Sequence, residues 1–205
     1  YNDVYRVDLP ATHRFPMGKY EAVRLSLQNE LQQQVELRVS PVSTVAELTT
    51  THTPEYVRRV CSDELAPSEL RRIGFPGGQQ SIDRALSSTG GTVAAARALF
   101  FFFLLVPFYQ RWRKLENIKI QRFEGYCVFS DIAVAANCIL NEQPARVQRV
   151  LIVDLDVHQG NGNAVLFQGK PAVFTYSMHC KGNYFSAVEA SDVDVEVKTG
   201  AGDDE

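Results

Sequence analysis

The sequence feature that most constrains this chain is the segment of residues 150–162, which reads VLIVDLDVHQGNG. Its first four residues form a continuous apolar run rich in β-branched side chains, which is typical of a buried parallel strand. The glycines at its end permit a tight turn and a close approach of backbone. Acidic and imidazole side chains therefore follow the carboxyl end of a predicted strand, where open α/β sheets bind ligands.

Three polar residues in this segment, Asp154, Asp156 and His158, are spaced two apart. In an extended chain their side chains would project to the same side. Two carboxylates and an imidazole that converge suit a divalent metal, and this donor set fits zinc, with iron or manganese as alternatives. The structural alternative is an aspartate-rich strand end that only caps the next helix. A lone DxD would favour that alternative, whereas DxDxH between VLIV and GNG favours a metal site.

The second half of the chain has an α/β pattern. Residues 132–140 are apolar and compatible with a helix, and residues 172–176 form a second apolar run after a short connection. A strand, a short crossover and another strand are typical of a parallel sheet with covering helices. We therefore expect an α/β fold.

The first half of the chain is predicted to be mainly helical. Apolar periodicity predicts a helix over residues 19–31, and proline at a first helical position predicts another that starts at residue 54. Alternation predicts a short strand over residues 35–39. Glycine and proline predict a loop over residues 75–80, and residues 81–99 have a helical composition. Gly90-Gly91 would either break that helix or pack closely in its middle.

The overall composition narrows the class of protein. The 205 residues suit one domain with its own core, and the formal net charge of −3 gives no electrostatic reason to expect direct nucleic-acid binding. The four cysteines show neither CxxC pairing nor dense spacing, so we expect reduced thiols in an intracellular protein. The apolar run at residues 99–106 is far shorter than the ~20 residues needed to span a bilayer, so we expect no membrane segment.

The segment LIVDLDVHQGNG resembles the metal-binding motif of the histone deacetylase and acetoin-utilisation family. The closest resemblance is to class IV and bacterial-type zinc-dependent deacetylases, in which Gln follows the histidine. Further segments match the family in the same order: residues 9–20 (LPATHRFPMGKY), 52–57 (HTPEYV), 71–76 (RRIGFP), 88–92 (STGGT), 125–135 (GYCVFSDIAVA), 174–180 (FTYSMHC) and 191–195 (SDVDV). The resemblance implies an arginase/deacetylase-like α/β fold, with a parallel sheet and helices on both faces. It also implies that residues 1–205 are a partial, incomplete deacetylase domain.

The resemblance also implies a metal site. Asp156 and His158 would be two of the three protein ligands of a zinc ion. Asp154 would lie behind them and, together with backbone oxygens near Ser177 and Met178, would help to hold a structural potassium ion.

The resemblance further assigns residues to the substrate. Gly125 would offer its carbonyl to the substrate amide N–H, and Tyr126 would form one aromatic wall of the lysine tunnel. Tyr184 is a weaker match for the opposite wall. Ser130 stands where the family usually has asparagine. The remaining histidines, His13, His52 and His179, are expected to be structural.

The family hydrolyses the acetyl amide of lysine side chains, so the implied partners are acetylated lysine peptides or proteins such as histone tails. Nuclear or cytoplasmic localisation is what the family suggests. A different hydrolase of the same family, acting on acetylpolyamine or another small amide, is an alternative.

Several family residues have no match here. The catalytic histidine pair normally precedes the GYCVF stretch, yet no histidine lies between Gly91 and Gly125. The third zinc ligand and the oxyanion-stabilising tyrosine are expected further along than Glu205. We therefore expect negligible deacetylase activity and an aggregation-prone product from this polypeptide, and a non-catalytic pseudo-deacetylase that binds partners is the second interpretation.

Residues 99–123 are foreign to their surroundings, because poly-Phe passes directly into a basic stretch without turn signals. A translated intron or misjoined exon explains the clean family match on both sides. A real lineage-specific replacement is the alternative.

Overall fold

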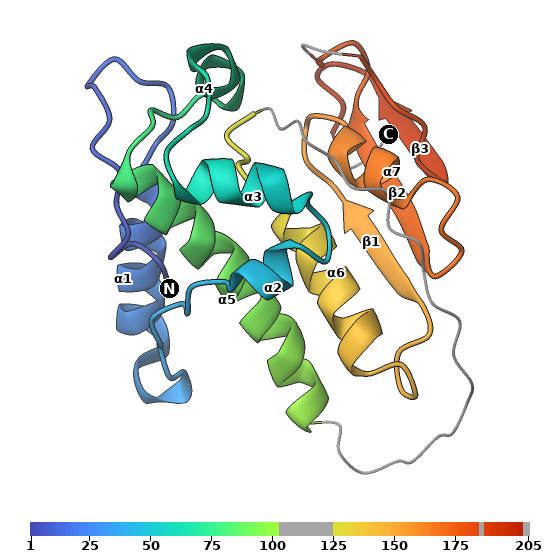
Figure 1. The fold of residues 1–205 in the computed structure, drawn as a ribbon, viewed down its shortest axis with the longest axis horizontal. Coiled ribbons are helices and arrows are strands. Elements are labelled where there is room, and N and C mark those ends of the chain that lie inside the picture. The colour runs from blue at the N-terminus through green and yellow to red at the C-terminus, as the bar shows by residue number, and fades with distance from the viewer. Residues whose placement is uncertain (103–124, 185–186, 203–205) are drawn as a thin grey trace.

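The computed structural model describes residues 1–102, 125–184 and 187–202 (Figure 1). In chain order, the elements are α1 (Lys19–Leu31), η1 (Gln32–Gln34), α2 (Val45–Leu48), α3 (Pro54–Cys61), α4 (Pro67–Ile73), α5 (Gln79–Phe102), α6 (Asp131–Glu142), β1 (Val150–Asp154), α7 (Asn161–Phe167), β2 (Val173–Cys180) and β3 (Val193–Val197). Helices form one side of the molecule and the sheet forms the other, with α6 between them (Figure 1). Most of residues 99–123 lie outside the described part, so the interpretations of that segment stay predictions.

The helical half begins with elements whose ends are fixed by local chemistry. Thr44 and Glu47 form a reciprocal capping box at α2, and the Thr53 hydroxyl accepts a hydrogen bond from the Tyr56 N–H at the start of α3. Gly74 ends α4 in the left-handed region, with φ +88°. These caps fix the ends of the short helices, and α3 starts at Pro54, as the sequence predicts.

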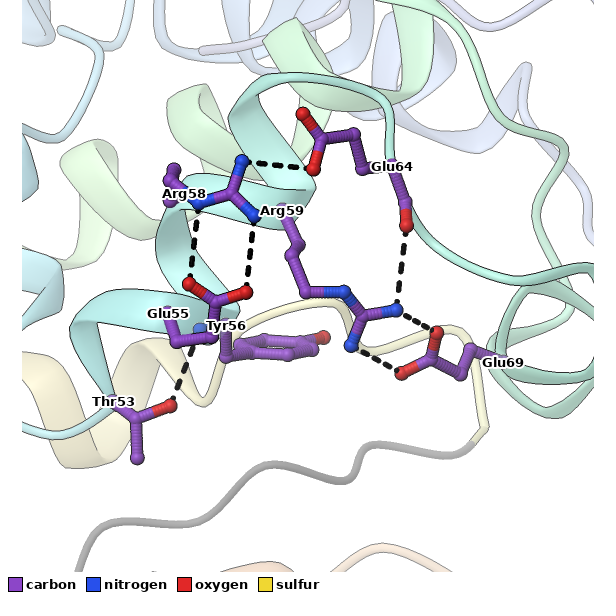
Figure 2. Close-up of polar contacts among 7 residues, drawn as sticks. All are labelled: Thr53, Glu55, Tyr56, Arg58, Arg59, Glu64 and Glu69. Carbon is purple, nitrogen blue, oxygen red and sulfur yellow. Dashed lines mark hydrogen bonds and ion pairs between the residues drawn. The ribbon is translucent and has the colours of Figure 1, made fainter.

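Ion pairs connect α3 to the residues that follow it (Figure 2). Arg59 pairs with Glu69 of α4, and its guanidinium also donates to the Glu64 carbonyl at 3.3 Å. Arg58 pairs with Glu55 at 3.0 Å and with Glu64 at 2.8 Å. Of these ion pairs, Arg59–Glu69 is the one that joins α3 to α4.

Helix α5 is continuous through Gly90 and Gly91, so the close-packing interpretation of these glycines is correct. A Cβ atom on Gly90 would lie 2.6 Å from the backbone nitrogen of Ser43, and one on Gly91 would lie 2.7 Å from the Ser40 hydroxyl. The chain before α2 therefore crosses directly over the backbone of α5. The helix also starts earlier than predicted, at Gln79, which shortens the expected loop.

Helix α6 is buried over most of its length, and eight consecutive residues from Ala133 to Leu140 are buried. Val134 and Cys138 join the cluster shared with α2, α3 and α5. Ala133 and Leu140 join a second cluster with β1, α7 and β2. The helix thus links the helical half of the molecule to the sheet.

The sheet is parallel, in the order β1-β2-β3, which confirms the predicted α/β class in incomplete form. The register places Asp154 beside Ser177 at the end of β1. Within the described residues, α6 and α7 pack on one sheet face through Ile152 and Val173. On the other face, Leu151 and Val153 are 62% and 54% exposed. The sequence predicts a strand that is buried on both faces, whereas β1 is buried on one face only.

Two further expectations need correction. Residues 35–39 are not a strand, because they pair with no neighbouring strand; the nearby Ser40 N–H donates to the Tyr1 carbonyl at 2.7 Å instead. Strand β3 was not predicted, since its alternating acidic residues obscure the apolar pattern. Among the described residues, no helix is both long and apolar enough to cross a membrane.

Candidate metal centre and substrate loops

The candidate metal ligands lie in the loop that follows β1. The strand ends at Asp154, so the predicted extended arrangement of the three polar residues is wrong beyond this point. Instead, the Asp156 N–H donates to Asp154 Oδ1 at 3.1 Å, and the His158 N–H donates to Asp156 Oδ1 at 2.8 Å. These two successive turns bring the side chains of Asp156 and His158 together, with Nδ1 of His158 3.3 Å from Oδ1 of Asp156.

The separation of these two atoms, which is that of an ion pair, is also compatible with two ligands of one zinc ion. Zinc binds nitrogen and carboxylate oxygen at about 2.0–2.2 Å in tetrahedral geometry, which places two ligand atoms roughly 3.3 Å apart. Both side chains are largely exposed, so an ion could reach them. In the described ranges no group of three histidine, cysteine or acidic side chains is placed to hold a metal. The role of Asp156 and His158 as zinc ligands stays a prediction, and we call this pair the candidate metal half-site.

Asp154 occupies a corner between β1, β2 and the turn at Gly160. A Cβ atom on Gly160 would lie 2.5 Å from Asp154 Oδ2, so only glycine allows the carboxylate this close to the backbone. The Gly160 N–H donates to the Ser177 hydroxyl at 3.1 Å. Met178 follows Ser177 in β2. The potassium site expected from Asp154, Ser177 and Met178 stays a prediction.

The predicted substrate loop begins at Gly125 and Tyr126, which both have positive φ, +64° and +69°. The Tyr126 N–H donates to the Ile73 carbonyl at 2.6 Å. The Tyr126 ring lies 5.0 Å from the ring of Phe15 and 5.4 Å from that of Phe75. Loops from three parts of the chain thus converge on Tyr126, although its role as a tunnel wall stays a prediction.

His13 belongs to the same aromatic cluster. Its Nε2 atom lies 2.9 Å from the Gly74 carbonyl, and its Nδ1 accepts a hydrogen bond from the Phe15 N–H at 3.1 Å. Its ring stacks on Phe75 with a centroid distance of 6.2 Å. These contacts are structural, as predicted.

Buried groups of the helical half hold the other end of the substrate loop. The Tyr56 hydroxyl donates to the Val128 carbonyl at 2.8 Å, and the Ser130 N–H donates to His52 Nε2 at 3.3 Å. His52 is fully buried, and burial raises the pKa of the Tyr56 hydroxyl above its ordinary value. His52 is thus structural, as predicted, and Ser130 contributes its backbone rather than its side chain.

The predicted substrate loop also contains Cys127, whose thiol has a raised pKa. Although Cys127 is exposed, desolvation raises this pKa, and together with smaller contributions from the carboxylates of Asp131, Asp156 and Asp154 it brings the value to about 11. The Tyr184 ring lies 6.2 Å from that of His158 in an edge-on arrangement. The role of Tyr184 as the opposite tunnel wall stays a prediction.

Two buried polar residues, His179 and Gln159, form contacts close to the candidate half-site. His179 Nδ1 lies 3.0 Å from the Ser177 hydroxyl, which agrees with the structural role predicted for His179. Gln159 was not predicted to have a role. Its side chain is 6% exposed and contacts Glu189 and Asp194. The only sequence signal was its position, directly after His158, where other family branches often carry a second histidine.

Comparison with known proteins identifies the family. The histone deacetylase domain matches residues 117–202. An uncharacterized protein of Picosynechococcus sp. is 35% identical over 209 residues, a match that covers 100% of this chain and 67% of that protein. The chain belongs to the histone deacetylase family. Two named deacetylases match a shorter part: histone deacetylase 5 of Arabidopsis thaliana is 48% identical over 56 residues, and histone deacetylase HDA1 of Candida albicans is 46% identical over 55 residues.

These matches differ in extent. Each of the two named deacetylases matches 27% of this chain, and the matched part is 8% and 7% of their own lengths, respectively. The chain spans about two thirds of the Picosynechococcus relative. By family, the chain is thus a hydrolase of the deacetylase type.

Proposed function

We propose that this chain carries the metal-binding and substrate-binding half of a zinc-dependent deacylase that acts on acyl-lysine side chains of proteins. The observation that carries the proposal is the 3.3 Å spacing between His158 Nδ1 and Asp156 Oδ1. Two donors at this spacing, next to a loop with an exposed tyrosine, suit a metal that acts on a bound amide. Histone tails are one class of substrate with such side chains.

Each part of the site has a separate task in this proposal. Bound zinc would supply Lewis-acid polarisation of the acyl carbonyl and would lower the pKa of water. Asp156 and His158 would hold the ion, and the Gly125 carbonyl would accept a hydrogen bond from the substrate amide N–H. Tyr126 and Tyr184 would flank the apolar stem of the lysine. Tyr56 would keep the Gly125 loop in place through its bond to Val128.

The proposal includes weak metal binding and negligible turnover for this polypeptide. Catalytic zinc sites normally supply three protein ligands, whereas the described residues bring two together. A general base is also needed for hydrolysis, and no histidine lies between Gly91 and Gly125, where the family places it. The same observations favour a second candidate function, a non-catalytic module that binds acylated peptides.

A metal titration tests the half-site. We expect the purified chain to bind one Zn²⁺ or Co²⁺, and we expect Asp156→Asn and His158→Gln each to weaken binding by about tenfold or more. Glu36→Gln, an exposed carboxylate outside the site, is the matched control and should leave the affinity unchanged. Equal affinity in all four proteins would refute the metal half-site.

Peptide assays separate the two candidate functions. Fluorescence polarisation with acetyl-lysine and unmodified lysine peptides measures recognition, and release of acetate measures turnover. Binding that prefers the acetylated peptide, without turnover, supports the binding module. Robust zinc-dependent turnover that is lost in both site variants would show a working deacylase and would contradict the expected inactivity. No preference for the acetylated peptide and no turnover would refute both functions.

The sequence of the native protein before Gly125 distinguishes the non-catalytic module from the complete enzyme. Mass-spectrometric peptide mapping of the protein from its source cells, focused on residues 97–125, gives a direct answer. Peptides from the Phe-rich segment would favour the non-catalytic module. A histidine-containing peptide that joins the same flanks would favour the complete enzyme.

A further inference from the structure

One arginine is buried without a counter-charge. The side chain of Arg84 in α5 is 7% exposed, and its Nε and Nη1 atoms are inaccessible to solvent. Neither atom has a hydrogen-bond partner among the described residues. The guanidinium lies over the ring of Tyr20, with 4.0 Å between Cζ and the ring centroid. This cation–π contact does not satisfy the hydrogen-bonding capacity of Nε and Nη1.

Burial of an unpaired guanidinium is unfavourable. Arginine stays protonated at all ordinary pH values, so it cannot lose its charge when it is buried. An isolated buried charge is normally paired or hydrogen-bonded. Other arginines of the described helices follow this rule: Arg24, Arg59 and Arg97 each pair with a carboxylate. Arg84 has no such partner among the described residues, so an anion from solution would supply the missing counter-charge.

The surroundings of Arg84 include a space for such a ligand. Arg84 lines a small hollow between the first residues of the chain, α1 and α5. Arg6 is a second arginine among the residues of its wall. Of the two carboxylates on the wall, Asp3 is already neutralised by Arg24 through bonds of 3.0 and 2.8 Å. Glu21 forms no described ion pair with Arg84. The charge around the hollow therefore suits one small anion.

We propose that this hollow is a binding site for a small oxyanion, either a phosphate or a carboxylate, held by the guanidinium groups of Arg84 and Arg6. Charge-assisted hydrogen bonds from guanidinium to such oxygens are among the strongest in proteins. The site lies with α1 and α5 in the helical half of the molecule, away from β1 and its metal half-site (Figure 1). It is therefore independent of the proposed deacylase function.

Binding is tested on the full chain with inorganic phosphate, acetate and chloride at equal ionic strength. Broadening of the phosphate ³¹P signal detects weak binding and needs no unfolding transition. We expect Arg84→Met to weaken this binding by about tenfold or more, and Arg6→Met to weaken it less. Arg38→Met, a highly exposed arginine elsewhere, is the matched control. A stronger response to acetate than to phosphate would identify the ligand as a carboxylate.

Thermal melts give an independent test, because added oxyanions should change the sign of the difference in melting temperature between the parent chain and Arg84→Met. In buffer without oxyanions, Arg84→Met should melt at the same temperature as the parent chain or higher, because an apolar side chain replaces an unpaired charge. With added phosphate or acetate, the parent chain should gain stability and the variant should not. The proposal is overturned if neither anion produces an Arg84-dependent shift, or if the variant is less stable under all conditions.

Discussion

The side-chain amide of Gln159 holds both backbone groups of Glu189. Its Nε2 donates to the Glu189 carbonyl, and its Oε1 accepts a hydrogen bond from the Glu189 N–H at 2.9 Å. Nε2 also donates to Asp194 Oδ1 at 2.9 Å. The residue directly after His158 thus fixes the chain that leads into β3.

Replacement of Gln159 should therefore loosen this segment. We expect Gln159→Ala to lower the free energy of unfolding by about 2–3 kcal/mol, because buried polar partners lose their hydrogen bonds. Urea denaturation measures this loss, and limited proteolysis near Glu189 should become faster. Gln168→Ala, an exposed glutamine in the turn after α7, should change the unfolding free energy by less than about 0.5 kcal/mol. Similar values for the two variants would contradict the role of Gln159.

The charge on Asp194 makes Gln159→Glu informative. The introduced carboxylate would face Asp194, whose own pKa is lowered, because hydrogen bonds from Gln159 and Ser191 outweigh the opposing effect of burial. We expect this variant to be least stable near neutral pH and to recover as pH falls below about 5, where the new carboxyl becomes protonated and is able to donate. A pH series of urea midpoints checks this, and a loss of stability that is independent of pH would argue against it.

Gly90 offers a test of the contact between α5 and the chain before α2. Glycine to alanine inside an exposed helix normally gains up to about 1 kcal/mol. At Gly90 we expect the opposite sign, a loss of about 1–3 kcal/mol, since the new methyl group would overlap the backbone of Ser43. Gly18→Ala is the control, because a Cβ atom there meets nothing within 4 Å. Thermal melts that show a gain for Gly90→Ala would refute the close contact.

The Arg59–Glu69 pair predicts a pH dependence (Figure 2). The hydrogen bond from Arg59 holds the pKa of the Glu69 carboxyl below its ordinary value. A lowered folded pKa contributes stability that is present above the unfolded value of about 4.3 and is lost as pH falls through the folded value. We expect Glu69→Gln to lose about 1 kcal/mol at pH 7 and almost nothing near pH 3. An equal loss at both pH values, measured by urea denaturation, would show that charge is not involved.

Cys138 should resist alkylation in the folded chain. Burial raises the pKa of its thiol to about 11, so the thiolate that reacts is roughly a hundredfold scarcer at pH 7 than for an ordinary cysteine. Mass spectrometry after timed exposure to iodoacetamide should show slower labelling of Cys138 than of Cys61, which is exposed. Denaturant should remove the difference. Equal rates in the folded chain would mean that α6 is not packed as described.

The sequence predicts the elements whose signals are local. Apolar periodicity gives the bounds of α1, Pro54 gives the start of α3, and the VLIV run gives β1. It also brings Asp156 and His158 together, because they lie within one short segment, while their role as metal ligands stays a prediction. The prediction of a strand at residues 35–39 fails, because an alternating pattern forms a strand only beside a neighbouring strand, and no described strand pairs with these residues. The sequence pattern also misses β3, where every second residue is acidic.

Long-range contacts of the site are the part that sequence reasoning does not reach. The bond from Tyr56 to Val128 joins residues 72 positions apart, and the bond from Gln159 to Asp194 joins residues 35 apart. Neither leaves a periodic or local pattern. The buried charge of Arg84 is equally hidden, because it follows from the packing of α1 against α5 rather than from neighbouring residues. Such features depend on tertiary packing alone.

The burial of α6 has a consequence for how this chain tolerates genetic variation. Eight consecutive positions of α6 face either the helical half or the sheet, whereas α1 contains no buried residue. In a deep mutational scan, polar substitutions at each of these eight positions of α6 should lower the fraction of folded protein. The exposed positions of α1 should accept most side chains. Random drift in this gene should therefore accumulate in α1 and leave α6 nearly unchanged.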